Sequence, residues 1–129
     1  MTGDLFFNLA VAGSRGFSDY PLLKEEVESF ILNFAPGRRV RILSGHARGA
    51  DRLGEKLAVE KGYELLIFPA DWDTHGRAAG PIRNSEMIKK ADGLIAFWNG
   101  RSRGTSDSIK KAEERGIPVR AVKYVDYSA

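Results

Sequence analysis

Three stretches of the sequence end an apolar run with a segment that contains glycine, arginine and a second glycine. They are Gly13-Ser14-Arg15-Gly16, Gly45-His46-Ala47-Arg48-Gly49 and Gly100-Arg101-Ser102-Arg103-Gly104. Each precedes a segment with helical periodicity. Glycine lets a ligand approach the backbone, the first amides of a helix attract anions, and arginine offers a fork of donors that matches phosphate. We therefore predict one anion site, for the phosphate of a nucleotide. The alternative is that these residues only make turns.

The predicted site extends beyond these three segments. The stretch Phe68–Asn84 has no clear period, and so long a connection in a compact domain is usually functional. We expect three of its residues, Arg77, Arg83 and Asn84, to close over the ligand. The residues predicted to bind the nucleotide are Gly13, Ser14, Arg15, Gly45, Arg48, Gly49, Arg77, Arg83, Asn84, Arg103, Gly104 and Thr105. Trp72 and Trp98 follow the third and fourth strands, where an indole either stacks on a base or covers the end of the sheet.

The same residues disfavour several common sites. The segment around Arg103 lacks the spacing and the lysine of a P-loop, and Ala12 stands where a nucleophile elbow needs its first glycine. Gly13 begins no dinucleotide fingerprint, because the third glycine is missing. His46 and His75 have no acidic partner evident in the sequence, and without cysteine they make no convincing metal site. We expect no metal and no cofactor.

The elements that must position these residues alternate along the chain. Apolar runs predict strands at 5–12, 40–43, 64–68, 93–98 and 118–122. Four helical patterns lie between them, and Gly62 and Gly116 are predicted as left-handed helix ends. Alternation of this kind predicts a single α/β domain over residues 1–129, a doubly wound, mostly parallel, five-stranded Rossmann-like sheet with helices on both faces. The last residues, 123–129, are expected to fray.

Composition limits the remaining classes of protein. The chain has 129 residues, 43% of them hydrophobic and 29% charged, with a formal net charge of +3 and no cysteine. No segment is long and apolar enough for a membrane helix, and the N-terminus has no basic region before its apolar stretch. We therefore expect a cytoplasmic protein that does not act at a membrane. The basic residues are dispersed along the chain, so we do not expect nucleic-acid binding.

The motifs taken together resemble a known family. From about Leu9 to Val119 the chain is similar to the YspA/YpsA-related branch of the SLOG superfamily, which includes the LOG phosphoribohydrolases and the DNA-processing protein A fold. The resemblance rests on GSRGF, SGHARGADRLGEKLAVEKG, FPADWDTHGRAAGPIRNSEMI, ADGLIAFWNGRSRGTSDSI and GIPV. It implies a Rossmann-like fold that binds a nucleotide or nucleotide-derived ligand at the strand ends. It also implies a homo-oligomer.

One departure from the resemblance bears on catalysis. LOG enzymes carry a GG.GT..E motif whose glutamate engages the ribose; Gly104 and Thr105 match its core, but Ser108 stands in place of the glutamate. Cleavage of an N-glycosidic bond needs a carboxylate near the sugar. The candidates for catalysis are Asp107, Asp51 and Arg83, although Asp51 could equally stabilise a helix start.

Three functions follow from this sequence. The first is a module that binds a nucleotide in order to sense or sequester it. The second is an enzyme that cleaves the N-glycosidic bond of a nucleoside monophosphate. The third is a protein that binds single-stranded nucleic acid, which rests only on the basic isoelectric point. Of the three, the binding module is the prediction.

Overall fold

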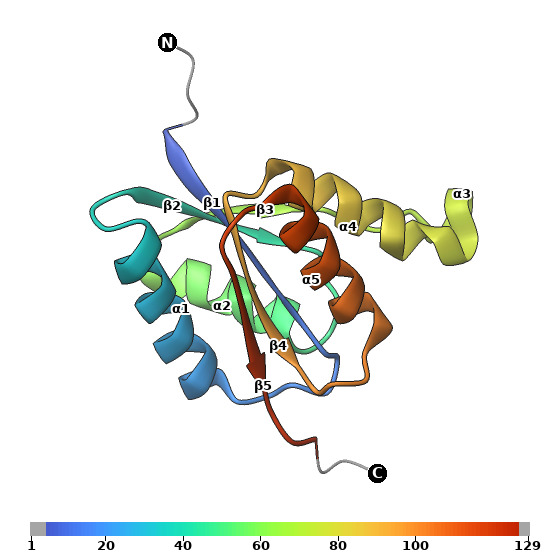
Figure 1. The fold of residues 1–129 in the computed structure, drawn as a ribbon, viewed down its shortest axis with the longest axis horizontal. Helices are drawn as coiled ribbons and strands as arrows, with labels where there is room; N and C mark the ends of the chain where they lie inside the picture. The colour runs from blue at the N-terminus through green and yellow to red at the C-terminus, as the bar shows by residue number, and fades with distance from the viewer. Residues whose placement is uncertain (1–4, 127–129) are drawn as a thin grey trace.

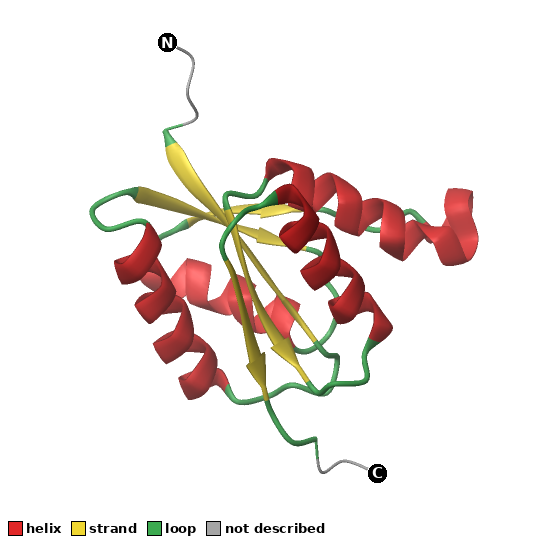
Figure 2. Ribbon diagram, in the orientation of Figure 1, coloured by secondary structure: helices red, strands yellow, loops and turns green. Residues whose placement is uncertain are grey.

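A computed structural model describes residues 5–126, which form one five-stranded sheet between two layers of helices (Figures 1 and 2). The strands are all parallel in the order β3-β2-β1-β4-β5. Their bounds are β1 Phe6–Gly13, β2 Arg39–Ser44, β3 Glu64–Ile67, β4 Gly93–Trp98 and β5 Val119–Lys123. The helices are α1 Tyr20–Phe34, α2 Ala50–Lys61, α3 Trp72–His75, the 3-10 turn η1 Gly76–Ala78, α4 Ala79–Lys90 and α5 Arg103–Arg115. The predicted α/β, Rossmann-like fold is confirmed.

The central strand β1 contributes side chains to the hydrophobic cores on both faces of the sheet. Its side chains alternate, so that Phe7, Leu9 and Val11 join the core under α1 and α2. Ala10 and Ala12 join the core under α4 and α5. Figure 1 shows these two helix pairs on opposite sides of the strands. Strands buried on both faces explain why the apolar runs in the sequence are nearly continuous.

The helix ends follow the predicted signals. Gly62 and Gly116 have φ of 73° and 80° and end α2 and α5 in the left-handed conformation. Asp19 caps α1 by accepting a hydrogen bond from the Leu22 amide, and Pro21 lies in the first helical turn, where no amide donor is lost. These local signals set where each helix meets the sheet.

The prediction of a long irregular connection over Phe68–Asn84 is wrong. Most of this stretch is helical, as α3, η1 and the first half of α4. Gly80 and Pro81 suggest a loop in the sequence, but both lie in the first turn of α4, where proline is tolerated. Arg83 and Asn84 therefore lie on a helix, which holds them more rigidly than a loop would.

The predicted frayed end also needs a correction. Lys123 belongs to β5, and the Tyr124 ring packs edge-on against Phe17 with 4.9 Å between ring centroids. The aromatic contact ties the chain down beyond the last strand. The rest of the predicted frayed segment, 127–129, lies outside the described residues. No helix within residues 5–126 is long and apolar enough to cross a membrane.

Candidate functional site

The loops after β1 and β4 meet where the strand order reverses. Gly13 is paired with Phe97 across the two strands, and the Ser14 amide donates to the Phe97 carbonyl at 2.9 Å. A Cβ on Gly13 would lie 2.5 Å from that carbonyl oxygen, so only glycine fits. Consecutive connections leave this point toward opposite faces of the sheet, and such a switch point is where open α/β sheets bind ligands.

The loop after β2 packs onto the same point. Gly49 has φ of 82°, and a Cβ there would lie 2.4 Å from the Ser14 carbonyl oxygen. Close approach and the left-handed backbone both require glycine at this position. The first two glycine-arginine segments are thus in direct backbone contact. The third follows β4 and reaches the same edge through the Ser14 hydroxyl, which accepts from the Asn99 amide at 3.2 Å.

These loops enclose a cavity of about 390 Å³, which we call the switch-point cavity. Eight of the predicted site residues line it, namely Gly13, Ser14, Arg15, Asp51, Arg83, Asn84, Gly104 and Thr105. Its wall also includes Ala12, Met87 and Ser108. The fold therefore brings residues that are distant in the sequence around one space, which has the size of a small-ligand site.

The N-terminus of α5 forms one wall of this cavity. Ser102 caps the helix by accepting from the Thr105 amide at 3.3 Å, and Asn99 accepts from the amides of Arg101 and Ser102 at 2.9 Å each. The amides of the first helical turn have no partner within a helix and carry partial positive charge. A Cβ on Gly104 would meet no atom within 4 Å, so this turn faces open space. An anion could therefore reach these amides.

Arg83 links the loop after β2 to α4. Its Nη1 donates to the Gly45 carbonyl at 2.5 Å, and its Nε donates to the Asn84 side-chain oxygen at 2.8 Å. Burial lowers the pKa of the Arg83 guanidinium, whereas nearby Asp51 favours its charged form. Two of its donors are thus occupied by protein groups, and the guanidinium is held in a fixed orientation beside the cavity.

Asn84 and Asp107 form a bridge between α4 and α5. The Asn84 amide nitrogen donates to the Gly104 carbonyl at 3.3 Å and to the Asp107 carboxylate at 3.0 Å. Lys111 also donates to that carboxylate, at 2.8 Å. Asp107 lines a neighbouring space and not the switch-point cavity. Its charge is already balanced by Lys111, which leaves Asp51 as the carboxyl group that faces the cavity.

Asp51 lies in the first turn of α2 and is 5% exposed. Its carboxylate accepts from the Ala47 amide at 3.2 Å. Burial raises the pKa of Asp51 to about 6, and the effect outweighs the opposing hydrogen bond from Ala47 and the charge of Arg83. A carboxyl group with a perturbed pKa in a cavity is a common feature of functional sites.

Two further spaces adjoin the switch-point cavity and share Arg15 and Arg83 with it. The arginine cavity, of about 330 Å³, is lined by Arg15, Gly45, His46, Ala47, Arg48, Arg52, Pro69, Ala70, Trp72 and Arg83. The tryptophan cavity, of about 400 Å³, is lined by Arg15, Trp72, Gly80, Pro81, Arg83, Asn84, Arg103, Gly104 and Asp107. Arg15 has no hydrogen-bond or ion-pair partner among residues 5–126, so its guanidinium is available at the junction.

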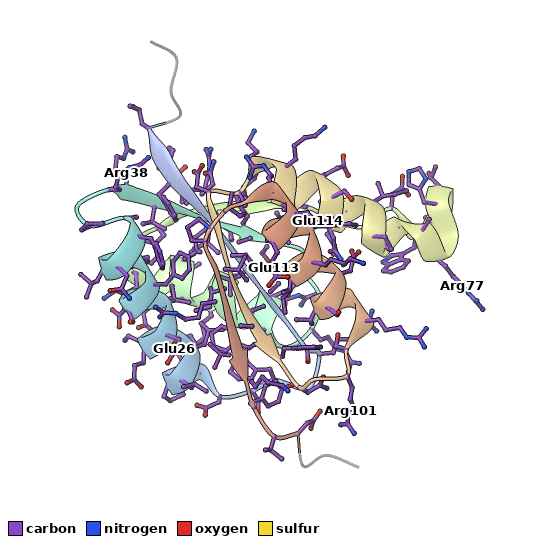
Figure 3. The ribbon with its side chains drawn as sticks, in the orientation of Figure 1. Glu26, Arg38, Arg77, Arg101, Glu113 and Glu114 are labelled. Atoms are coloured by element: carbon purple, nitrogen blue, oxygen red, sulfur yellow. The ribbon has the colours of Figure 1, made fainter. Side chains whose placement is uncertain are left out.

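Not every predicted residue reaches these spaces. Arg77 lies in η1 and is exposed; Figure 3 shows it pointing away from the body of the molecule beyond α3. Trp72 is 51% exposed and lines two of the cavities, whereas Trp98 donates its indole N–H to the Ser102 carbonyl at 3.1 Å and lines none of the three. Gly49 shapes the loop by its backbone contact.

The comparisons with known proteins identify the family of the chain. Residues 7–75 match the model of the YspA, cpYpsA-related SLOG family. The chain belongs to this family. It is also 39% identical over 84 residues to the Gene 61 protein of Mycobacterium phage D29, a match that covers 60% of this chain and 67% of the relative. SLOG membership, which the sequence motifs predicted, indicates a nucleotide-related function.

A solved structure supports the fold of this SLOG protein. The X-ray structure of DNA processing protein A from Streptococcus pneumoniae is similar, with a TM-score of 0.69 and 22% sequence identity. The match covers 90% of this chain and 50% of the other, so the chain spans about half the length of that protein. The likeness is therefore one of architecture.

Sequence reasoning missed one pair of residues in this SLOG protein. His46 does have an acidic partner: its Nδ1 lies 2.8 Å and 3.0 Å from the two carboxylate oxygens of Glu55. Glu55 lies nine residues later, on α2, one turn after Asp51. The spacing of Asp51 and Glu55 places both on one helix face, and this was the signal in the sequence. No group of three or more His, Cys, Asp or Glu residues in the described part of the chain could hold a metal ion.

Proposed function

We propose that this SLOG protein binds a nucleotide or nucleotide-derived ligand at the carboxyl ends of β1 and β4. One observation carries the proposal. The free guanidinium of Arg15 lies at the junction of three cavities, at the switch point of the sheet. An unpaired cation beside glycine-rich backbone and a helix N-terminus favours a phosphate ligand.

The phosphate would lie in the switch-point cavity. The backbone amides of Arg15 and Gly16, and that of Gly104 in the first turn of α5, would donate to its oxygens. Arg15 and Arg83 would balance its charge from the open side. Because Arg83 is already anchored to Gly45, it would bind without losing much side-chain entropy.

The base would lie against Trp72. The tryptophan cavity begins at the same arginines and is bounded by this half-exposed indole and by Pro81, two flat apolar surfaces. Stacking of a base on an aromatic side chain contributes about 1–3 kcal/mol in nucleic-acid complexes. A ligand with a phosphate at Arg15 and a planar ring at Trp72 would use both features.

Calorimetry with a panel of nucleoside monophosphates, cyclic nucleotides and inorganic phosphate tests this proposal. We expect at least one nucleotide to bind more tightly than phosphate alone. Arg15→Gln should weaken binding by about tenfold to a hundredfold, since a charge-assisted hydrogen bond contributes about 1.5–3 kcal/mol. Arg38→Gln is the matched control, because Arg38 precedes β2 at the opposite end of the sheet (Figure 3).

Two results would count against nucleotide binding. One is the absence of any binding heat or thermal stabilisation at millimolar nucleotide, since a ligand that binds the native state must stabilise it. The other is an equal loss of affinity in Arg15→Gln and Arg38→Gln, which would indicate a diffuse charge effect.

A second candidate function is the hydrolysis of the N-glycosidic bond of a bound nucleoside monophosphate. The observation that favours it is the carboxyl group of Asp51 in the wall of the switch-point cavity. Ionised Asp51 would stabilise positive charge on the sugar. Chromatography would detect free base after incubation with the protein, and Asp51→Asn should abolish its release. No free base above a heat-denatured control would exclude this activity.

A further inference from the structure

The His46–Glu55 pair is built like a catalytic base with its orienting group. A buried residue, Ser44, supports both members of the pair. Its hydroxyl donates to the Glu55 carboxylate at 2.7 Å and accepts from the His46 backbone amide at 3.0 Å. The Glu55 side chain is 14% exposed and that of His46 is 43% exposed. The carboxylate is thus fixed from within, while the imidazole reaches the surface of a cavity.

The arrangement leaves one imidazole nitrogen available. Because Nδ1 faces a carboxylate, the neutral ring carries its proton there, and Nε2 keeps its lone pair. Within residues 5–126, Nε2 has no hydrogen-bond partner. His46 lines the arginine cavity, and its side chain is 43% exposed, so a water molecule can reach the ring. A nitrogen base held in this way is suited to take a proton from water.

The remaining lining of the arginine cavity selects the substrate. Four arginines line it, Arg15, Arg48, Arg52 and Arg83, and no aspartate or glutamate does. Arg52 Nε also donates to the His46 backbone carbonyl at 3.1 Å, and this hydrogen bond fixes the position of Arg52 relative to His46. This concentration of positive charge fits a phosphate group with more than one negative charge.

We propose that this SLOG protein hydrolyses the terminal phosphate of a nucleotide with two phosphate groups, and that His46, held by Glu55, is the general base. The inference rests on the proposed function, because one phosphate occupies the switch-point cavity and the terminal one occupies the arginine cavity. Arg15 and Arg83 line both spaces and bridge the two groups.

The reaction consumes one water molecule. The water oxygen attacks the terminal phosphorus while His46 Nε2 takes one of its protons. The bond between this phosphorus and the bridging oxygen breaks, and its electron pair leaves on that oxygen. The leaving oxygen departs as part of the phosphate group of the shortened nucleotide and needs no proton from His46. The imidazolium gives its proton to solvent, so the products are inorganic phosphate, the shortened nucleotide and one proton. Arginines would stabilise the charge on the equatorial oxygens.

The backbone at His46 offers a test variant that keeps the fold. His46 has φ of 62°, in the left-handed region that glycine adopts without strain. In His46→Gly the imidazole is removed and a space remains where free imidazole can bind. Restoration of activity by added imidazole is a result that a merely structural role of His46 would not produce.

The experiment measures release of inorganic phosphate from ADP and, as a simple phosphomonoester, p-nitrophenyl phosphate. We expect the wild type to release phosphate from ADP, and a decrease in kcat of about a hundredfold or more in His46→Gly. Millimolar imidazole should restore part of this loss. Glu55→Gln should lower kcat with little change in KM, since Glu55 orients the base and does not touch substrate. His75→Gly and Glu86→Gln, at exposed positions on α3 and α4, should behave as wild type.

The outcomes separate this inference from nucleotide binding. Calorimetric binding of ADP without phosphate release overturns the hydrolase and leaves the proposed function intact. Phosphate release by His46→Gly at the wild-type rate also overturns it, as does a loss that imidazole fails to restore. If ADP and the other nucleotides do not bind at all, both proposals fail together.

Discussion

The two faces of the sheet differ in the size of the side chains that they bury. Under α1 and α2 the core contains large residues such as Phe7, Phe30 and Phe97. Under α4 and α5 the sheet contributes mainly alanines, among them Ala12 and Ala96. Small side chains leave room near the carboxyl ends of β1 and β4, and Ala12 itself lines the switch-point cavity. One face thus supplies most of the hydrophobic stabilisation, and the other supplies space.

Three of the buried polar residues belong to the helices α4 and α5, whereas Asp51 belongs to α2. Asn84, Thr105 and Ser108 are all less than 6% exposed and belong to α4 and α5. Buried polar groups cost stability unless they are hydrogen-bonded, and Asn84 satisfies its amide through Arg83, Gly104 and Asp107. We call the face under α4 and α5 the binding face, after the binding proposed for its cavity, and the face under α1 and α2 the packing face. A hydrogen-bond network holds the binding face, whereas the core of the packing face is apolar.

The largest expected effect comes from opening the packing face. Phe30 is fully buried, and a Cβ on Gly93 would lie 2.8 Å from its ring. Phe30→Ala should lower the free energy of unfolding by about 3–5 kcal/mol, through lost burial and a residual cavity. Urea denaturation measures it. Phe34→Ala is the control. Phe34 is 47% exposed, and its ring centroid lies 4.6 Å from that of Phe30, so removal of this ring should lower the free energy of unfolding by about 1 kcal/mol. Equal costs would refute this account of the packing face.

The second prediction is that Asp51→Asn raises the free energy of unfolding, by an amount that depends on pH. The pKa of Asp51 is raised from 3.8 to about 6 in the folded protein, so between these pH values the folded state binds more protons than the unfolded state. The free energy of unfolding therefore falls as pH rises through this window. Asp51→Asn should remove that fall and be more stable than wild type at neutral pH by about 3 kcal/mol, with no difference below about pH 4.

Urea denaturation of the wild type and of Asp51→Asn, repeated at about every pH unit from about pH 3 to 8, measures this difference in the free energy of unfolding. Glu86→Gln, an exposed carboxyl on α4, should leave the pH profile unchanged. A profile for Asp51→Asn that parallels the wild type would contradict the burial of Asp51 in the wall of the switch-point cavity.

The third substitution, Ala12→Leu, should have the smallest effect on stability and the largest effect on binding. Ala12→Leu places a large side chain on the binding face and should cost about 1–3 kcal/mol by overpacking. It should also abolish nucleotide binding, because the added atoms occupy the switch-point cavity. Ala91→Leu is the matched control, since Ala91 is fully buried under the same helices but lines none of the three cavities. Calorimetry that shows equal affinity for both variants would contradict the assignment of this cavity.

Short-range patterns explain how much of the fold was predictable. Apolar runs of strand length, helical stripes such as Leu23, Val27 and Phe30, and glycines at helix ends are local features, and each acts where it stands in the chain. The stretch Phe68–Asn84 was misjudged because the same Gly-Pro signal marks either a loop or the first turn of a helix. Packing of Met87 and Ile88 against the sheet decides for the helix.

The sequence by itself determined that three glycine-arginine segments end parallel strands, and hence that they lie at the same end of the sheet, where we predicted an anion site. Only the tertiary structure decided which residues share that site. It brings Asp51 and Arg83 to one cavity, leaves Arg77 in solvent, and pairs His46 with Glu55. The physical reason is that backbone propensity acts over a few residues, whereas a site depends on distances between side chains of different elements, which are set by how those elements pack.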